Sequence, residues 1–197
     1  MQTPIRSLAA PALVALLVTG CSGGGDDEDP RSAPSATSST SSGATSGDVD
    51  EAALRDGLVG LWVGDDRGPE DTATGECFAD ALLAASTPED LRAAGILDDT
   101  GAVVAELPVL DEQGAGLWVD AQLACTDFVA ESTRAQVAAT KGKVDRTAYT
   151  ECLRDALSEE EQRAAAIASL QGDLSGDAVA ALSQAQLTCV QQALPPD

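Results

Sequence analysis

The 197-residue chain contains no histidine and no asparagine, and its only lysines are Lys141 and Lys143. Without histidine, a serine nucleophile would need lysine as its base. The chain also lacks a Cys-x-x-Cys pair, a Gly-x-Ser-x-Gly elbow, a phosphate-binding loop, a dinucleotide fingerprint and an EF-hand loop. These absences argue against thiol redox chemistry, a zinc site, nucleophilic catalysis and nucleotide binding. We therefore expect no enzymatic activity, no cofactor and no catalytic or metal-binding residue.

Aromatic residues are scarce, at 3% of the chain. Four of the five fall at helical spacing and are expected in the core; the five are Trp62, Phe78, Trp118, Phe128 and Tyr149. An acid pair of the glycosidase kind stays open, because chance carboxylate pairs are certain in so acidic a chain. However, such sites usually also present aromatic platforms for sugars.

Basic residues are few compared with acidic ones. The whole chain has 33 acidic and 11 basic residues, and residues 49–197 alone have 28 and 9, a net charge of −19. This balance argues against nucleic acid as a partner and against direct docking on anionic lipid. It is typical of a soluble exported domain.

The first twenty residues have the layout of a secretory signal peptide. Arg6 supplies a positive charge, Ser7 to Val18 form a short apolar run, and Val18-Thr19-Gly20-Cys21 reads as a small-residue cleavage site. This site resembles the lipobox of bacterial lipoproteins, in which cleavage leaves the cysteine N-terminal and diacylated. The resemblance implies a lipidated (palmitate-bearing) Cys21 and an extracytoplasmic protein anchored to the cell membrane. A plain signal peptide with an incidental cysteine is the alternative.

Residues 21–48 are predicted to form a disordered tether after the lipidated cysteine. An acidic run, Asp26 to Asp29, leads into a segment of Ser, Thr, Gly, Ala and Pro without any large apolar residue. Burial in such a segment could not offset its loss of conformational entropy. The folded domain is therefore expected to span residues 49–197.

The domain contains a duplication. Residues 72–82 return as residues 147–157, with seven of eleven positions identical at an offset of 75. Residues 87–96 then match residues 158–167, and each copy closes on a second cysteine. The first copy covers about residues 72–131 and the second about residues 147–193.

Two cysteines in each copy predict two disulfides. The four domain cysteines allow three pairings, among which sequence alone does not choose. The duplication does choose, because each copy should carry its own bond. We therefore expect Cys77–Cys125 and Cys152–Cys189, formed in an oxidising compartment.

Helix signals dominate, and we predict an all-α single domain of six or seven helices built from the duplicated unit. Thr87-Pro88-Glu89-Asp90 combines a capping hydroxyl with proline at the first helical position, and Ser158 with Glu161 forms a capping box. Asp111 is expected to cap a long helix that continues to about Ala139, before Lys141-Gly142-Lys143 breaks it.

Both copies retain a pair of acids one helical turn apart. Such like charges repel one another, so bases from the next helix are expected to offset them. The carboxylates of these possible paired charges are Glu76, Asp80, Glu151 and Asp155, and the matched bases are Arg92 and Arg163. A divalent-cation site built from the paired carboxylates is the alternative.

The copies differ most in an insertion, Leu97 to Leu110, that is too apolar for a free loop. It is expected either to cap the core or to meet a partner. The sequence thus favours a membrane-anchored lipoprotein whose domain is a non-enzymatic interaction or structural module. Its partner would be an unidentified envelope protein or the cell wall. A lipoprotein that binds a small ligand or a divalent cation is the alternative.

Overall fold

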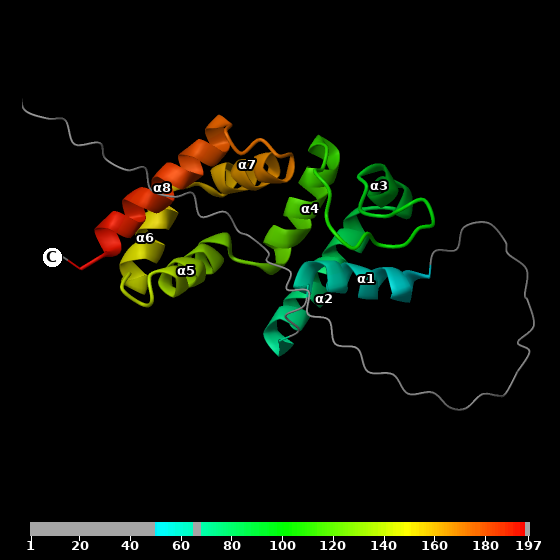
Figure 1. Cartoon of the computed structure of the whole chain (residues 1–197), viewed down its shortest axis with the longest axis horizontal. Coiled ribbons are helices and arrows are strands. Elements are labelled where there is room, and N and C mark those ends of the chain that lie inside the picture. Colours follow the sequence, from blue (N-terminus) through cyan, green and yellow to red (C-terminus); the bar gives the residue numbers. More distant parts are fainter. Residues whose placement is uncertain (1–49, 65–67, 196–197) are drawn as a thin grey trace, which may run out of the picture. The chain divides into compact units, whose positions relative to one another are not determined.

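The computed structural model describes residues 50–64 and 68–195 of the chain. The predicted signal peptide, Cys21 and the tether lie outside these residues. Regular structure in the described ranges is helical except for one isolated bridge between Leu97 and Val103, which confirms the all-α prediction. The helices of these ranges are α1 (Glu51–Val63), α2 (Pro69–Ala85), α3 (Pro88–Ala93), α4 (Glu112–Cys125), α5 (Phe128–Ala139), α6 (Arg146–Ala156), α7 (Glu159–Leu170) and α8 (Asp177–Ala193) (Figure 1). Within those ranges, no helix is both long enough and apolar enough to span a bilayer.

The capping signals in the sequence act as predicted. At α3, the Thr87 hydroxyl accepts from the Asp90 amide at 3.2 Å, and the Asp90 carboxylate accepts from the Thr87 amide at 2.9 Å. The same reciprocal pair joins Ser158 and Glu161 at α7. At α4, the Asp111 carboxylate accepts from the Gly114 amide at 2.7 Å. Each bond satisfies a helix N–H that would otherwise lack a partner.

The long helix predicted from Asp111 to about Ala139 is wrong, because the chain breaks after Cys125. Thr126 adopts an extended conformation with φ −133° and ψ 140°. Asp127 then caps α5, and its carboxylate accepts from the Ala130 amide at 2.9 Å. A short polar side chain that bonds to the backbone ahead of it competes with continuation of the helix. The break contributes to a count of eight helices in the described residues.

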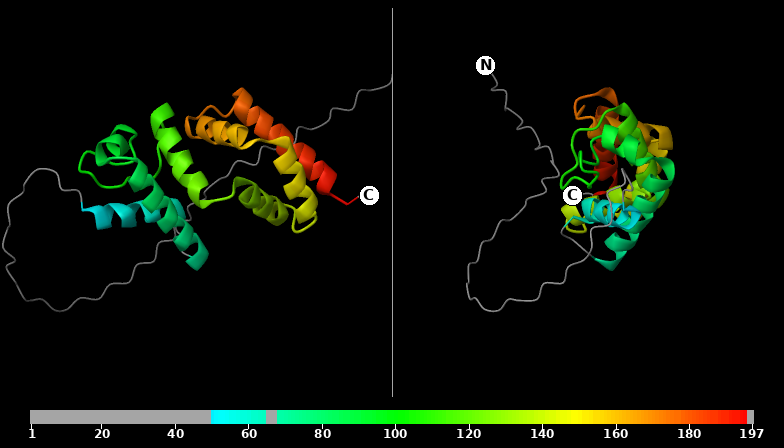
Figure 2. Two further views of the ribbon diagram at one scale, coloured as in Figure 1. Left: turned by 180° about the vertical axis from the view of Figure 1, so that it is seen from behind. Right: turned by 90° about the vertical axis from the view of Figure 1, so that its right-hand side faces the viewer.

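The helices form two sets of four. A disulfide joins α2 to α4 in the first set and α6 to α8 in the second. In addition, α1 packs on α2 as α5 packs on α6, and Figure 2 shows the same neighbours from behind. Each copy therefore carries one more helix on its N-terminal side than the sequence comparison indicates, and α5 belongs with the second copy.

The offset of 75 residues extends into these added helices. The buried positions are Leu54 and Leu58 in α1, and Val129 and Thr133 in α5. Val129 lies 75 positions after Leu54, and Thr133 lies 75 positions after Leu58, although the residue type differs in both pairs. Burial is thus kept where residue identity is lost.

An aromatic cluster forms the centre of the first core. Phe78 is fully buried, and its ring centroid lies 4.4 Å from that of Trp62 and 4.6 Å from that of Trp118. Gly75 lets α1 approach α2, since a Cβ there would lie 2.9 Å from Val63 Cγ2. Three of the chain's five aromatic residues therefore hold α1, α2 and α4 together.

The second core replaces part of this apolar packing with hydrogen bonds. Thr133 of α5 and Thr150 of α6, the counterparts of Leu58 and Gly75, bond through their hydroxyls at 3.0 Å. Tyr149 is fully buried, and its hydroxyl lies 3.1 Å from the Ser132 hydroxyl. Burial raises the pKa of the Tyr149 phenol, and its hydrogen bond with Ser132 opposes that rise.

The two copies meet where α4 packs against α7. Ile167 and Leu170 of α7 pack against the first core, and the Leu110 amide donates to the Leu170 carbonyl at 2.9 Å. An ion pair between Asp120 and Arg163 crosses the same contact at 2.6 Å. The insertion of the first copy is therefore fastened to the second copy.

Candidate functional site

The predicted partners of the repeated acids are wrong. Asp80 pairs with Arg55 of α1 at 2.6 Å, and Arg163 pairs with Asp120 of α4. The pKa of Asp80 is lowered by its hydrogen bond to Arg55, and that of Asp120 by its hydrogen bond to Arg163. Both pairs connect helices that pack side by side, so they are explained by helix packing.

The remaining members of the predicted set are not brought together. Arg92 lines a surface depression near Asp50 and Asp99. The carboxylates of Glu76, Glu151 and Asp155 are exposed, and no ion pair of the described residues includes them. Across residues 50–64 and 68–195, no group of three acidic or cysteine side chains is placed to hold a metal ion. The divalent-cation alternative therefore gains no support from this part of the chain.

Both disulfides have the pairing that the duplication predicts. Cys77 bonds to Cys125 and Cys152 bonds to Cys189, with Cα–Cα distances of 5.8 Å and 5.5 Å. Their surroundings differ, because Cys77 is exposed whereas Cys189 is fully buried. The two bonds should therefore respond differently to a reductant.

We expect a mild reductant to open Cys77–Cys125 before Cys152–Cys189. Thiolate attack requires access to a sulfur atom. The first bond joins the exposed Cys77 to the half-buried Cys125, whereas the second joins the half-buried Cys152 to the fully buried Cys189. Timed alkylation of the native protein, followed by peptide mapping, measures the two rates. Faster reduction of Cys152–Cys189, or equal rates, would contradict the expected order.

The apolar insertion packs against the core on one side and is exposed to solvent on the other. Leu97 and Leu110 are buried, and Val103 and Leu107 pack against the first core. In contrast, Val109 is 73% exposed. The insertion is thus part of the core, and it also presents one large apolar side chain outward.

A second exposed apolar residue, Leu174, lies in the connection whose Gly172 is next to Val109. A Cβ on Gly172 would lie 3.6 Å from Val109 Cγ1, and Leu174, two residues later in the α7–α8 connection, is 68% exposed. We call these two side chains the Val109–Leu174 patch. The segments that carry it, residues 105–112 and 171–177, contain five acids and no base.

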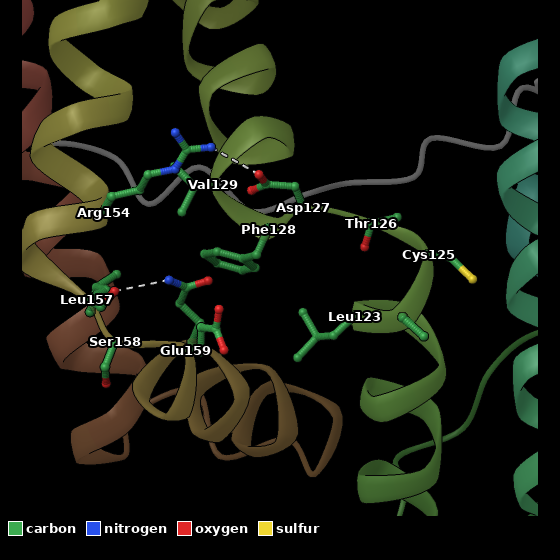
Figure 3. Close-up of a pocket in the computed structure, with 12 residues that line it drawn as sticks. Leu123, Cys125, Thr126, Asp127, Phe128, Val129, Arg154, Leu157, Ser158 and Glu159 are labelled. Carbon is green, nitrogen blue, oxygen red and sulfur yellow. Dashed lines mark hydrogen bonds and ion pairs between the residues drawn. The ribbon is translucent and has the colours of Figure 1, made fainter.

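A cleft lies where four helix ends meet. The last residues of α4 and α6 and the first residues of α5 and α7 enclose about 770 Å³ (Figure 3). The lining residues are Leu123, Ala124, Cys125, Thr126, Asp127, Phe128, Val129, Arg154, Leu157, Ser158, Glu159 and Gln162. Figure 3 shows the Phe128 ring, the Leu123 side chain and the Glu159 carboxylate around the central space.

Two of the three charged side chains of this cleft neutralise each other. Arg154 of α6 donates to the Asp127 carboxylate at 3.1 Å. The pKa of Asp127 is lowered, chiefly by its hydrogen bond from the Ala130 amide and further by Arg154. Gln162 is buried and donates to the Leu157 carbonyl at 3.0 Å. Glu159 is left as the charge without an ion-pair partner among the described residues.

Comparisons with family models, curated proteins and solved structures give no match. The function therefore has to be inferred from the residues of the chain itself.

The sequence did not reveal the cleft, because its lining comes from four separate helix ends. The one available signal was the pair of capping motifs at Asp127 and Ser158, which mark helix starts.

Proposed function

We propose that the chain is an exported lipoprotein whose helical domain is a non-enzymatic interaction or structural module of the cell envelope. The observation that carries this proposal is the pair of disulfides, one in each copy. Structural disulfides form and persist in oxidising compartments and are rare in the cytosol. The Val18-to-Cys21 motif supports the same compartment independently.

The proposed anchor is a lipid on Cys21. The following residues, up to 48, would then separate the domain from the membrane. A flexible linker of this length has a root-mean-square span of about 30 Å. The net charge of −19 on residues 49–197 opposes contact with an anionic surface. The domain would therefore face partners away from the bilayer.

The Val109–Leu174 patch is the surface best suited to such a partner. Both side chains are exposed, and the backbone at Val109 is held in place, since the neighbouring Leu110 is buried and bonded to α7. Acids surround the patch without any base in the same segments. We propose a partner protein that presents an apolar residue bordered by basic ones.

A photo-crosslinking amino acid at position 109 tests this surface. In cells, we expect it to form a discrete adduct with one envelope protein, because Val109 lies in the proposed contact. The same amino acid at Leu187, which is 53% exposed on α8, serves as the matched control and should form no such adduct.

A second variant separates binding from folding. Leu174→Asp should abolish the adduct from position 109 and leave the melting temperature within roughly 2 °C, because an exposed side chain contributes little to stability. Equal crosslinking from positions 109 and 187, or an adduct that survives Leu174→Asp, would contradict the proposed patch.

A further inference from the structure

The cleft between the two copies is not used by the proposed protein interface. Its volume of about 770 Å³ lies within the range of small-molecule sites, about 300–1,000 Å³. It combines apolar walls with a few polar groups, as such sites do. The charge and polarity of its lining residues therefore indicate which class of ligand it would bind.

The electrostatics of the cleft favour a cation. The exposed Glu159 carboxylate has no ion-pair partner among residues 50–64 and 68–195, whereas Arg154 is held by Asp127. Helices α4 and α6 end at the cleft, and the carbonyls of a last helical turn carry partial negative charge. The opposing N-termini of α5 and α7 are capped by acidic or hydroxyl side chains, Asp127 and Ser158.

The apolar part of the cleft favours a ligand with a hydrocarbon or ring body. Phe128 is only half-buried, as is Leu123, although both are large apolar residues. Phe128 and Glu159 both line the cleft, and Figure 3 labels both. An aromatic face attracts a cation, and a neighbouring carboxylate adds to that attraction.

We propose that this cleft binds a small organic cation, an amine or guanidine carried on an apolar body. The apolar body lies against Phe128 and Leu123, and the charged group faces Glu159. The site does not depend on the lipid anchor or on the Val109–Leu174 patch. A failure of one proposal is therefore distinguishable from a failure of the other.

Three probes that share one body test the proposal: 4-phenylbutylamine, 4-phenylbutanol and 4-phenylbutyrate. Detergent would compete for an apolar cleft, so the titration uses the full chain carrying Cys21→Ser. We expect calorimetry at pH 7 to show binding of the amine. We also expect about three- to tenfold weaker binding of the alcohol, which lacks both the ion pair and the cation–π contact, and no binding of the acid.

Two exposed neighbours supply a matched pair of variants. Glu159→Gln should weaken binding of the amine about three- to fivefold and leave binding of the alcohol unchanged. Glu160→Gln, outside the cleft, should change the affinity for either probe by no more than roughly twofold. Phe128→Leu should weaken the binding of both the amine and the alcohol.

Equal losses from Glu159→Gln and Glu160→Gln would mean adsorption to an acidic surface and would overturn the site. Absence of amine binding would overturn it as well. Binding of a basic peptide in place of the amine would assign the cleft to a protein partner and also refute the proposal.

Discussion

Replacing Cys152 and Cys189 together with alanine should destabilise the domain by about 4 kcal/mol, since the bond closes a loop with a sequence separation of 37 residues. A loss of this size corresponds to a fall in melting temperature of roughly 8–16 °C for a domain of this length. Denaturant unfolding of the wild type and of the double variant measures the difference.

The corresponding change at Cys77 and Cys125 provides the comparison. Its loop has a separation of 48 residues, so its entropic contribution is similar, about 4 kcal/mol. However, Cys189 is fully buried and Cys77 is exposed, so alanine at 189 also leaves a cavity. The second-copy variant should therefore be the less stable of the two.

Two further variants complete this test: a control that removes no disulfide and a variant that lacks both disulfides. Cys21→Ala should leave the melting temperature unchanged, because it removes no bond of the domain. Loss of both disulfides should leave the chain largely unfolded, since domains are usually stable by only about 5–15 kcal/mol. A loss below about 1 kcal/mol in either double variant would show that the bonds do not stabilise this fold.

The second large effect concerns location. Cys21→Ser should move the protein from the membrane fraction to a soluble or an uncleaved form, because serine lacks the thiol that accepts the diacylglycerol. Fractionation followed by immunoblotting measures the shift. Ser22→Ala, one residue further on, serves as the control and should remain with the membrane.

Retention of a cleaved Cys21→Ser protein in the membrane fraction would contradict the lipid anchor. The uncleaved form is not a contradiction, since the cysteine is itself part of the cleavage motif. Comparing gel mobilities of the variant and the wild type separates these two results.

Local signals in the sequence predicted much of the fold. The caps at Thr87 and Ser158 depend on residues three positions apart, so they can be read without knowledge of the packing. The pairing of the cysteines depends on the repeated order of the two copies, which the sequence also contains. Neither required a statement about which helices touch.

Features that depend on packing were missed. The apolar spacing from Trp118 to Val129 continues across the break at Thr126, so periodicity alone joined α4 to α5. Helices α1 and α5 correspond in the positions that are buried, but the residues at these positions are not identical. The partners of Asp80 and Arg163 lie 25 and 43 residues away, on helices whose contacts the sequence does not specify.

The position of each side chain in the insertion also depends on packing, so the sequence predicted the insertion only in part. Composition indicated that Leu97 to Leu110 was too apolar for solvent, and most of its large side chains do pack against the first core. Composition could not indicate that Val109 would turn outward, next to Gly172 of the other copy. That placement depends on the backbone bond between Leu110 and Leu170.

Intact-mass analysis of the wild-type protein, extracted from the membrane fraction, tests the proposed exported lipoprotein most directly. We predict a chain that begins at Cys21, carries the added mass of a diacylglycerol, and is four hydrogens lighter than its fully reduced form because of its two disulfides. A chain that keeps residues 1–20, an unmodified Cys21 or four free thiols in the domain would contradict it.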